Sequence, residues 1–148
     1  MKAKPAAALP KKLMNVSLDG IELDDVSLAK AVIHDATFEG ARLDDVSLAK
    51  ATIHNATFEK AEFDDVEFRK AKINNASFKG AELSDVTFAK CKINNGSFEG
   101  AKMDDITFAG ATLKNGNLDG MTIEGCSIEG LSIDGVRIDE LLKEKRTS

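Results

Sequence analysis

Apolar residues recur at every fifth position along most of the chain. From Leu18 to Ile138, each of these central positions holds Leu, Ile, Phe or Met. Two residues before each central position stands a second apolar or small residue, from Val16 to Val136. Apolar positions therefore alternate in steps of two and three residues, which would leave no continuous buried face on an α-helix or on a flat strand.

Only a chain that bends once in every five residues keeps all of these side chains inside. The bends are expected two places after each central position, where residues that tolerate left-handed backbone or close their own turns recur. They include Gly20, Asp25, Asp35, Gly40, Asp45, Asn55, Asp65, Asn75, Gly80, Asn95 and Gly100. A longer period of twenty residues overlies the period of five, because VSLAKA occurs at 26–31 and again at 46–51. Four bends therefore close one coil, and the chain is predicted to be a four-sided solenoid of about six coils.

The five-residue units VSLAK, ATFEG, ARLDD and AKMDD resemble those of the pentapeptide repeat family, in which a small and a polar residue precede a central Leu or Phe. The resemblance covers about five sixths of the chain. It implies an all-β fold, a right-handed quadrilateral parallel β-helix, with the central and small residues inside. The handedness comes from the resemblance, whereas the four-sided coil follows from the residue pattern.

Three segments are expected along the chain. They are an N-terminal arm or cap at 1–15, the β-helix at 16–138, and a short C-terminal capping helix with a tail at 139–148. Asp139 and Glu140 suit the start of a helix, and Leu141 and Leu142 would then lie over the last coil. Such a cap would cover the apolar end of the solenoid. The protein is expected to be a monomer, or a dimer through this C-terminal end.

Residues twenty positions apart should stack into columns. The predicted core ladder is Phe38, Phe58, Phe78 and Phe98. The side-chain amides of Asn55, Asn75, Asn95 and Asn115 are expected to stack from coil to coil at one bend. Cys91 and Cys126 occupy small-residue positions, so both are predicted to be buried free thiols.

Composition indicates a single domain in the cytoplasm. The chain has 148 residues, a hydrophobic content of 43% and a net charge of −5. Its apolar runs are too short for a membrane span, and the apolar centre of its opening residues is too short for a signal peptide. Two predicted free thiols also suit a reducing compartment.

Nine aspartates are predicted to lie along one corner of the solenoid, and we call them the acidic ridge. The ridge consists of Asp24, Asp25, Asp44, Asp45, Asp64, Asp65, Asp85, Asp104 and Asp105. A basic column of Lys30, Lys50, Lys70 and Lys90 should run one bend further along. The aspartates can serve the turns and keep the surface solvated. They can also form a recognition surface, in which case the partner should be basic.

The resemblance adds a specific form of the second interpretation. Some pentapeptide repeat proteins imitate DNA and occupy the DNA-binding saddle of type II topoisomerases. A ladder of carboxylates spaced by about 4.8 Å is a coarse likeness of a phosphate backbone. This chain is shorter than those relatives, lacks their loops and carries a lysine column beside its acidic one.

No catalytic or cofactor-binding motif is recognised in the sequence. His34 and His54 should be neighbours on an outward column, but Asn74 and Asn94 continue it, so no metal site is predicted. A filled rod also offers no cleft for catalysis. We therefore expect a non-enzymatic structural or protein-interaction solenoid of unknown partner, with a DNA-mimicking regulator of a type II topoisomerase as the alternative. Cofactors, direct nucleic-acid binding and membrane association are not expected.

Overall fold

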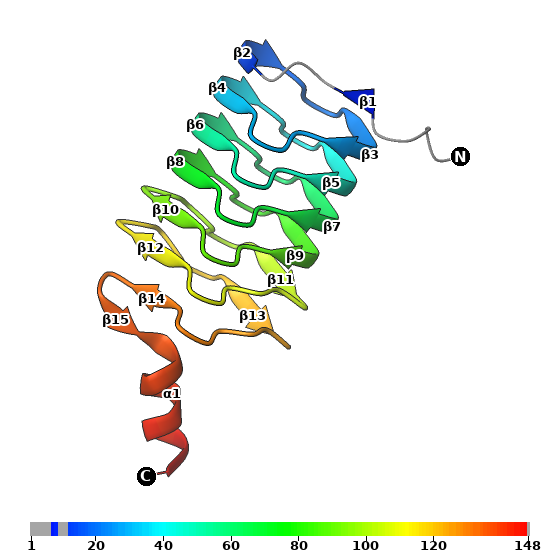
Figure 1. The fold of residues 1–148 in the computed structure, drawn as a ribbon. Coiled ribbons are helices and arrows are strands. Elements are labelled where there is room, and N and C mark those ends of the chain that lie inside the picture. The colour runs from blue at the N-terminus through cyan, green and yellow to red at the C-terminus, as the bar shows by residue number, and fades with distance from the viewer. Residues whose placement is uncertain (1–6, 9–11, 148) are drawn as a thin grey trace.

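The computed structural model describes residues 7–8 and 12–147, and these residues form a rod of stacked coils (Figure 1). Two sheets run along the rod. Sheet A contains, in spatial order, β1 (Ala7–Ala8), β3 (Glu22–Ser27), β5 (Arg42–Ser47), β7 (Glu62–Glu67), β9 (Glu82–Thr87), β11 (Lys102–Asp104) and β13 (Thr122–Glu124). Sheet B contains β2 (Lys12–Ser17), β4 (Val32–Thr37), β6 (Thr52–Thr57), β8 (Lys72–Ser77), β10 (Lys92–Asn94), β12 (Thr112–Lys114), β14 (Ser132–Ile133) and β15 (Val136–Arg137). The helix α1 (Ile138–Thr147) follows β15.

Strand pairing follows a register of twenty residues. In sheet A, Leu43 lies beside Leu23, and in sheet B, Ile53 lies beside Ile33. The coils pair in parallel, whereas β15 turns back and pairs antiparallel with β14. Each circuit of the rod therefore uses twenty residues, as the sequence predicted.

Left-handed backbone marks every corner of a coil. In one circuit, φ is 56° at Asp25, 65° at Lys30, 54° at Asp35 and 68° at Gly40. These residues stand two places after the central positions, where the sequence predicted the bends. Four corners in each circuit of twenty residues confirm an all-β, four-sided parallel solenoid of about six coils.

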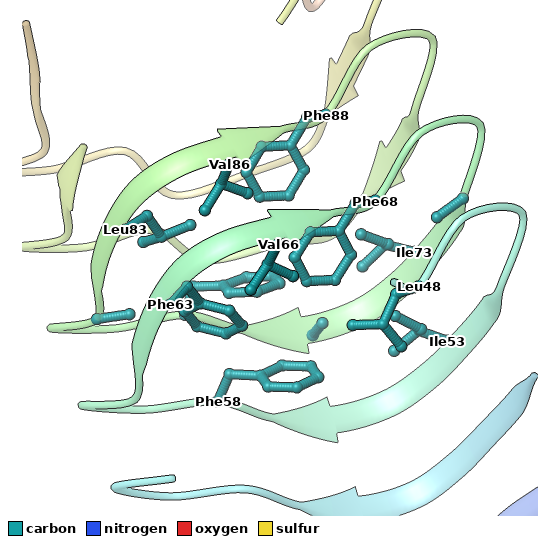
Figure 2. Close-up of a cluster of buried hydrophobic side chains, with 14 of the residues drawn as sticks. Leu48, Ile53, Phe58, Phe63, Val66, Phe68, Ile73, Leu83, Val86 and Phe88 are labelled. Carbon is teal, nitrogen blue, oxygen red and sulfur yellow. The ribbon is translucent and has the colours of Figure 1, made fainter. Parts of the chain in front are cut away.

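Stacked phenylalanine rings fill the middle of the rod. The ring centroids of Phe38, Phe58, Phe78 and Phe98 are separated by 4.7, 5.0 and 4.8 Å, and the planes are nearly parallel. Figure 2 shows Phe58, Phe63 and Phe68 pointing into the space between the two sheets. The predicted core ladder is confirmed, and its rings are at most 1% exposed.

The C-terminal helix does not cover the last coil. Figure 1 shows α1 projecting beyond β14 and β15, away from the stacked coils. Leu141 and Leu142 are 42% and 39% exposed, and the core packs against Ile138 instead. The expectation that both leucines lie over the last coil is therefore wrong, because the chain leaves the rod as soon as the helix begins.

Cys126 also departs from the prediction. Cys91 is buried, but Cys126 is half-buried because it lies in the last coil, which no further coil covers. Both cysteines are free thiols, as expected. At the other end, β2 begins at Lys12, inside the segment expected to be an arm, and most of residues 1–11 lie outside the described part of the chain.

Candidate interaction surface

The outward side chains of sheet A gather acidic groups on one side of the rod. In β7, Phe63 points into the core, while its neighbours Glu62 and Asp64 face solvent. Equivalent residues in the other coils extend these two columns, and we call this surface the acidic side. Its charged residues are Glu22, Asp24, Arg42, Asp44, Glu62, Asp64, Glu82, Lys102, Asp104 and Glu124.

In the described coils, the opposite side of the rod carries a single acidic residue, Asp134, in the equivalent columns. These positions lie ten residues, or half a coil, further along the chain. They are Lys12, Met14, Val32, His34, Thr52, His54, Lys72, Asn74, Lys92, Asn94, Thr112, Lys114, Ser132 and Asp134, and we call them the basic side. The rod is therefore electrically polarised across its width.

Five residues of the predicted acidic ridge have a backbone reason to be where they are. Asp25, Asp45, Asp65, Asp85 and Asp105 occupy corners with φ between 53° and 56°. Aspartate tolerates this left-handed conformation better than most residues do. At the equivalent corners of sheet B, asparagine does the same, as at Asn55 and Asn75.

The other four ridge residues have no such reason. Asp24, Asp44, Asp64 and Asp104 lie within strands, and Ser84 interrupts their column. The equivalent strand positions of sheet B hold methionine, histidine, asparagine or lysine. Folding therefore does not require an acid at these positions.

A groove runs along the acidic side, parallel to the rod axis, although the sequence predicted a filled rod without a cleft. Its volume is about 590 Å³, and residues from β5, β7, β9, β11 and β13 line it. The lining residues are Arg42, Glu62, Phe63, Asp64, Glu82, Leu83, Ser84, Lys102, Met103, Asp104, Thr122 and Glu124. The predicted ridge omitted Glu62, Glu82 and Glu124, although a comparison of residues twenty positions apart would have found them.

The predicted basic column occupies a neighbouring corner. Lys30, Lys50, Lys70 and Lys90 have φ between 60° and 65° and lie one bend beyond the aspartate corner. Lysine is less suited to left-handed backbone than glycine, which fills the same column at Gly110. The lysine column lies at the next corner from the aspartates, and none of its four residues lines the groove.

His34 and His54 are neighbours on the basic side, as predicted. Their ring centroids are 4.8 Å apart, and His34 Nδ1 lies 2.8 Å from Asp35 Oδ2. Among residues 7–8 and 12–147, no group of three or more His, Cys, Asp and Glu side chains is arranged to hold a metal ion. In the same part of the chain, no helix is long and apolar enough to cross a membrane.

Comparisons with known proteins identify the family. Residues 61–138 match a model described as a pentapeptide repeat region, and residues 38–82 match a model of nine pentapeptide repeats. The first match spans more than half of the chain, so this protein belongs to the pentapeptide repeat family. A search of curated proteins finds no significant match.

Solved structures of other pentapeptide repeat proteins are similar at low sequence identity. Rfr23 from the cyanobacterium Cyanothece 51142 is 16% identical, with coverage of 84% of this chain and 88% of that one and a TM-score of 0.42. A thylakoid-lumen protein from Arabidopsis thaliana is 19% identical, with coverage of 90% and 77% and a TM-score of 0.34. Full-length QnrB1, a plasmid-mediated fluoroquinolone resistance protein, is 15% identical, with coverage of 96% and 98% and a TM-score of 0.30.

Proposed function

We propose that this protein is a non-enzymatic scaffold that binds a basic partner protein through its acidic side. The observation that carries the proposal is the contrast between equivalent strand positions in the two sheets. Asp44 and Asp64 on the acidic side occupy the same place in the coil as His54 and Asn74 on the basic side. Since both sets of positions lie in strands of the same solenoid, the fold does not require aspartate there. We infer that the aspartates serve binding at the surface.

The polarised rod favours a partner that contacts one side. A basic protein surface placed against the acidic side gains electrostatic attraction and stays away from the lysines opposite. A DNA mimic inside a topoisomerase saddle would be enclosed by basic protein on more than one side. Lys72, Lys92 and Lys114 would then face like charges. The scaffold is therefore the function that the charge distribution supports better. The free thiols suit the cytoplasm as its compartment.

A charge-reversal experiment tests this function. The wild-type protein is used as bait, and the proteins that it captures are purified and titrated against wild type and the variant Asp44→Lys/Asp64→Lys/Asp104→Lys. Dissociation constants should rise steeply with salt for wild type, because screening weakens exposed charge contacts. Lys72→Glu/Lys92→Glu/Lys114→Glu is the control on the basic side. A captured partner that binds all three proteins equally would contradict the proposal.

The topoisomerase alternative has its own assay. DNA supercoiling by a bacterial type II topoisomerase should be unchanged when this protein is added in large molar excess. Inhibition or quinolone protection that the acidic-side variant abolishes would establish the DNA mimic in place of the scaffold. Thermal melting of each variant, compared with wild type, verifies that the charge reversals leave the rod folded.

A further inference from the structure

The groove on the acidic side follows from the strand geometry. Each strand points its central residue inward and the residues on either side of it outward, so its outer surface is lowest at the centre. Stacking coils in register aligns these low points along the rod. Phe63, Leu83 and Met103 mark the line of the groove, and each is 2% exposed.

The backbone beneath the groove is already hydrogen-bonded. The backbone amides of Glu62, Glu82 and Lys102 each donate to a carbonyl of the preceding coil, over 2.8 to 3.0 Å. A ligand in the groove therefore cannot extend the sheet by adding a strand along this line. Its recognition has to come from the side chains that form the two walls.

These walls hold carboxylates that lack protein partners. Glu62 and Glu82 are register neighbours on adjacent strands, with Arg42 beyond one of them and Lys102 beyond the other. None of these four side chains makes an ion pair in the described part of the chain. Two like charges side by side are unfavourable unless a cation lies between them. Asp64 and Asp104 on the facing wall add to the negative potential.

The length of the groove indicates the shape of its ligand. From β5 to β13 there are four coil spacings, or about 19 Å at about 4.8 Å each. An extended peptide rises about 3.3 Å per residue, so about six residues fit along the groove. The groove volume of about 590 Å³ lies within the range of ligand-binding clefts, and the rest of such a segment would lie in solvent above it. Metal ions lack a suitable cluster of ligands here, and nucleic acid would be repelled.

We propose that the groove between Arg42 and Glu124 binds an extended, lysine- or arginine-rich segment of the partner protein, aligned with the rod axis. This inference rests on the proposed function and assigns a specific place to the contact. The basic side chains of the segment lie between the two walls, where Glu62, Asp64 and Glu82 stand on the adjacent strands β7 and β9. The aspartates at the corners add a negative potential around the groove, whereas the side chains of the groove contact the segment directly.

The test uses a fluorescein-labelled hexalysine peptide and measures its anisotropy with the full-length protein. Glu62→Gln/Glu82→Gln should weaken binding by about tenfold or more at about 50 mM salt, because the lysine side chains of the peptide lose two negatively charged partners. Asp65→Asn/Asp85→Asn removes the same charge at two corners, where asparagine keeps the backbone conformation. This control should weaken binding by less than about threefold.

A second pair of variants tests whether binding requires the open groove itself, apart from its charge. Ser84→Phe fills the groove without changing any charge and should also abolish most of the binding. Asn94→Phe places the same ring at the equivalent position on the basic side and should leave binding unchanged. Equal losses in the groove and corner pairs, or full binding by Ser84→Phe, would overturn the groove site. The charge-reversal experiment on the whole acidic side would still decide the proposed function separately.

Discussion

The side chain of Asn75 donates a hydrogen bond to the side-chain oxygen of Asn55 in the preceding coil, with nitrogen and oxygen 3.2 Å apart. Asn55 donates in turn to Asp35 over 3.1 Å, and Asn95 donates to Asn75 over 3.0 Å. Each asparagine in this ladder has left-handed backbone. The predicted stacking of amides is confirmed for Asn55, Asn75 and Asn95, whereas Asn115 donates to Asn94 and so leaves the ladder. Within the ladder, one residue type meets both the backbone and the hydrogen-bonding requirement.

Two substitutions at Asn75 should separate these requirements. Asn75→Gly keeps the left-handed backbone but removes two exposed side-chain hydrogen bonds, so we expect a loss of about 1 kcal/mol in the free energy of unfolding. Asn75→Ala should lose about 1 kcal/mol more, because its Cβ is unfavourable at this φ. Denaturant unfolding measures both values. Equal stability of the two variants would show that the backbone conformation carries no cost here.

Phe78 should be among the most sensitive core positions. Its ring is stacked between Phe58 and Phe98, and it is fully buried. Phe78→Ala is expected to cost about 3 to 5 kcal/mol, since coils held by parallel ladders cannot collapse into the void. Phe38→Ala, at the end of the ladder, should cost less. A loss below about 1 kcal/mol at Phe78 would contradict the importance of the ladder.

The start of the helix should depend on pH through Asp139. Its carboxylate accepts hydrogen bonds from Arg137 and from the backbone amide of Gly130, and these contacts lower the pKa of Asp139 below its ordinary value of 3.8. A lowered folded-state pKa stabilises the protein above the unfolded pKa, and this stabilisation is lost as pH falls further. The melting temperatures of wild type and Asp139→Asn should therefore converge as pH falls below about 4. A constant difference between them down to pH 2 would contradict this linkage.

The two cysteines should differ in reactivity. Burial raises the pKa of Cys91 to about 12, and it also raises the pKa of the half-buried Cys126. Since the thiolate is the reactive form, a disulfide reagent at about pH 8 should modify Cys126 slowly and Cys91 only after unfolding. Cys126→Ser removes the slow phase and serves as the control. Rapid modification of two thiols in the native protein would contradict the burial of Cys91.

The C-terminal end is the expected site of self-association. Ile123, Val136 and Leu141 are 37%, 50% and 42% exposed, and no further coil covers β13 among the described residues. Apolar groups gathered at an open sheet end favour contact with a second copy. We expect wild type to sediment as a dimer and Ile123→Lys as a monomer. Val32→Lys, at an exposed apolar site near the other end, should not change the mass.

Repetition explains how much of the fold could be predicted from the sequence. The bend at Asp65 or Asn75 is a weak signal alone, but the same choice recurs in coil after coil, and the stacking of Phe58 on Phe78 follows from the period of twenty. Each of these residues has an identical residue twenty positions before it and twenty positions after it, in the two adjacent coils. The local pattern therefore determined the corners, the core ladder and the size of each coil.

Only the tertiary structure decided what happens where the repetition stops. The sequence places Leu141 and Leu142 where a cap could begin, but their position depends on the direction in which α1 leaves β15. The hydrogen bond from the Gly130 amide to Asp139 ties the start of the helix to the last coil, and both leucines stay exposed. Cys126 occupies an inward position of the repeat, but it lies in the last coil, so no further coil covers it and it is only half-buried. The groove likewise depends on the heights of side chains from five strands, which no single five-residue unit contains. Each of these features depends on contacts that occur once in the molecule, so the repeating pattern could not predict them.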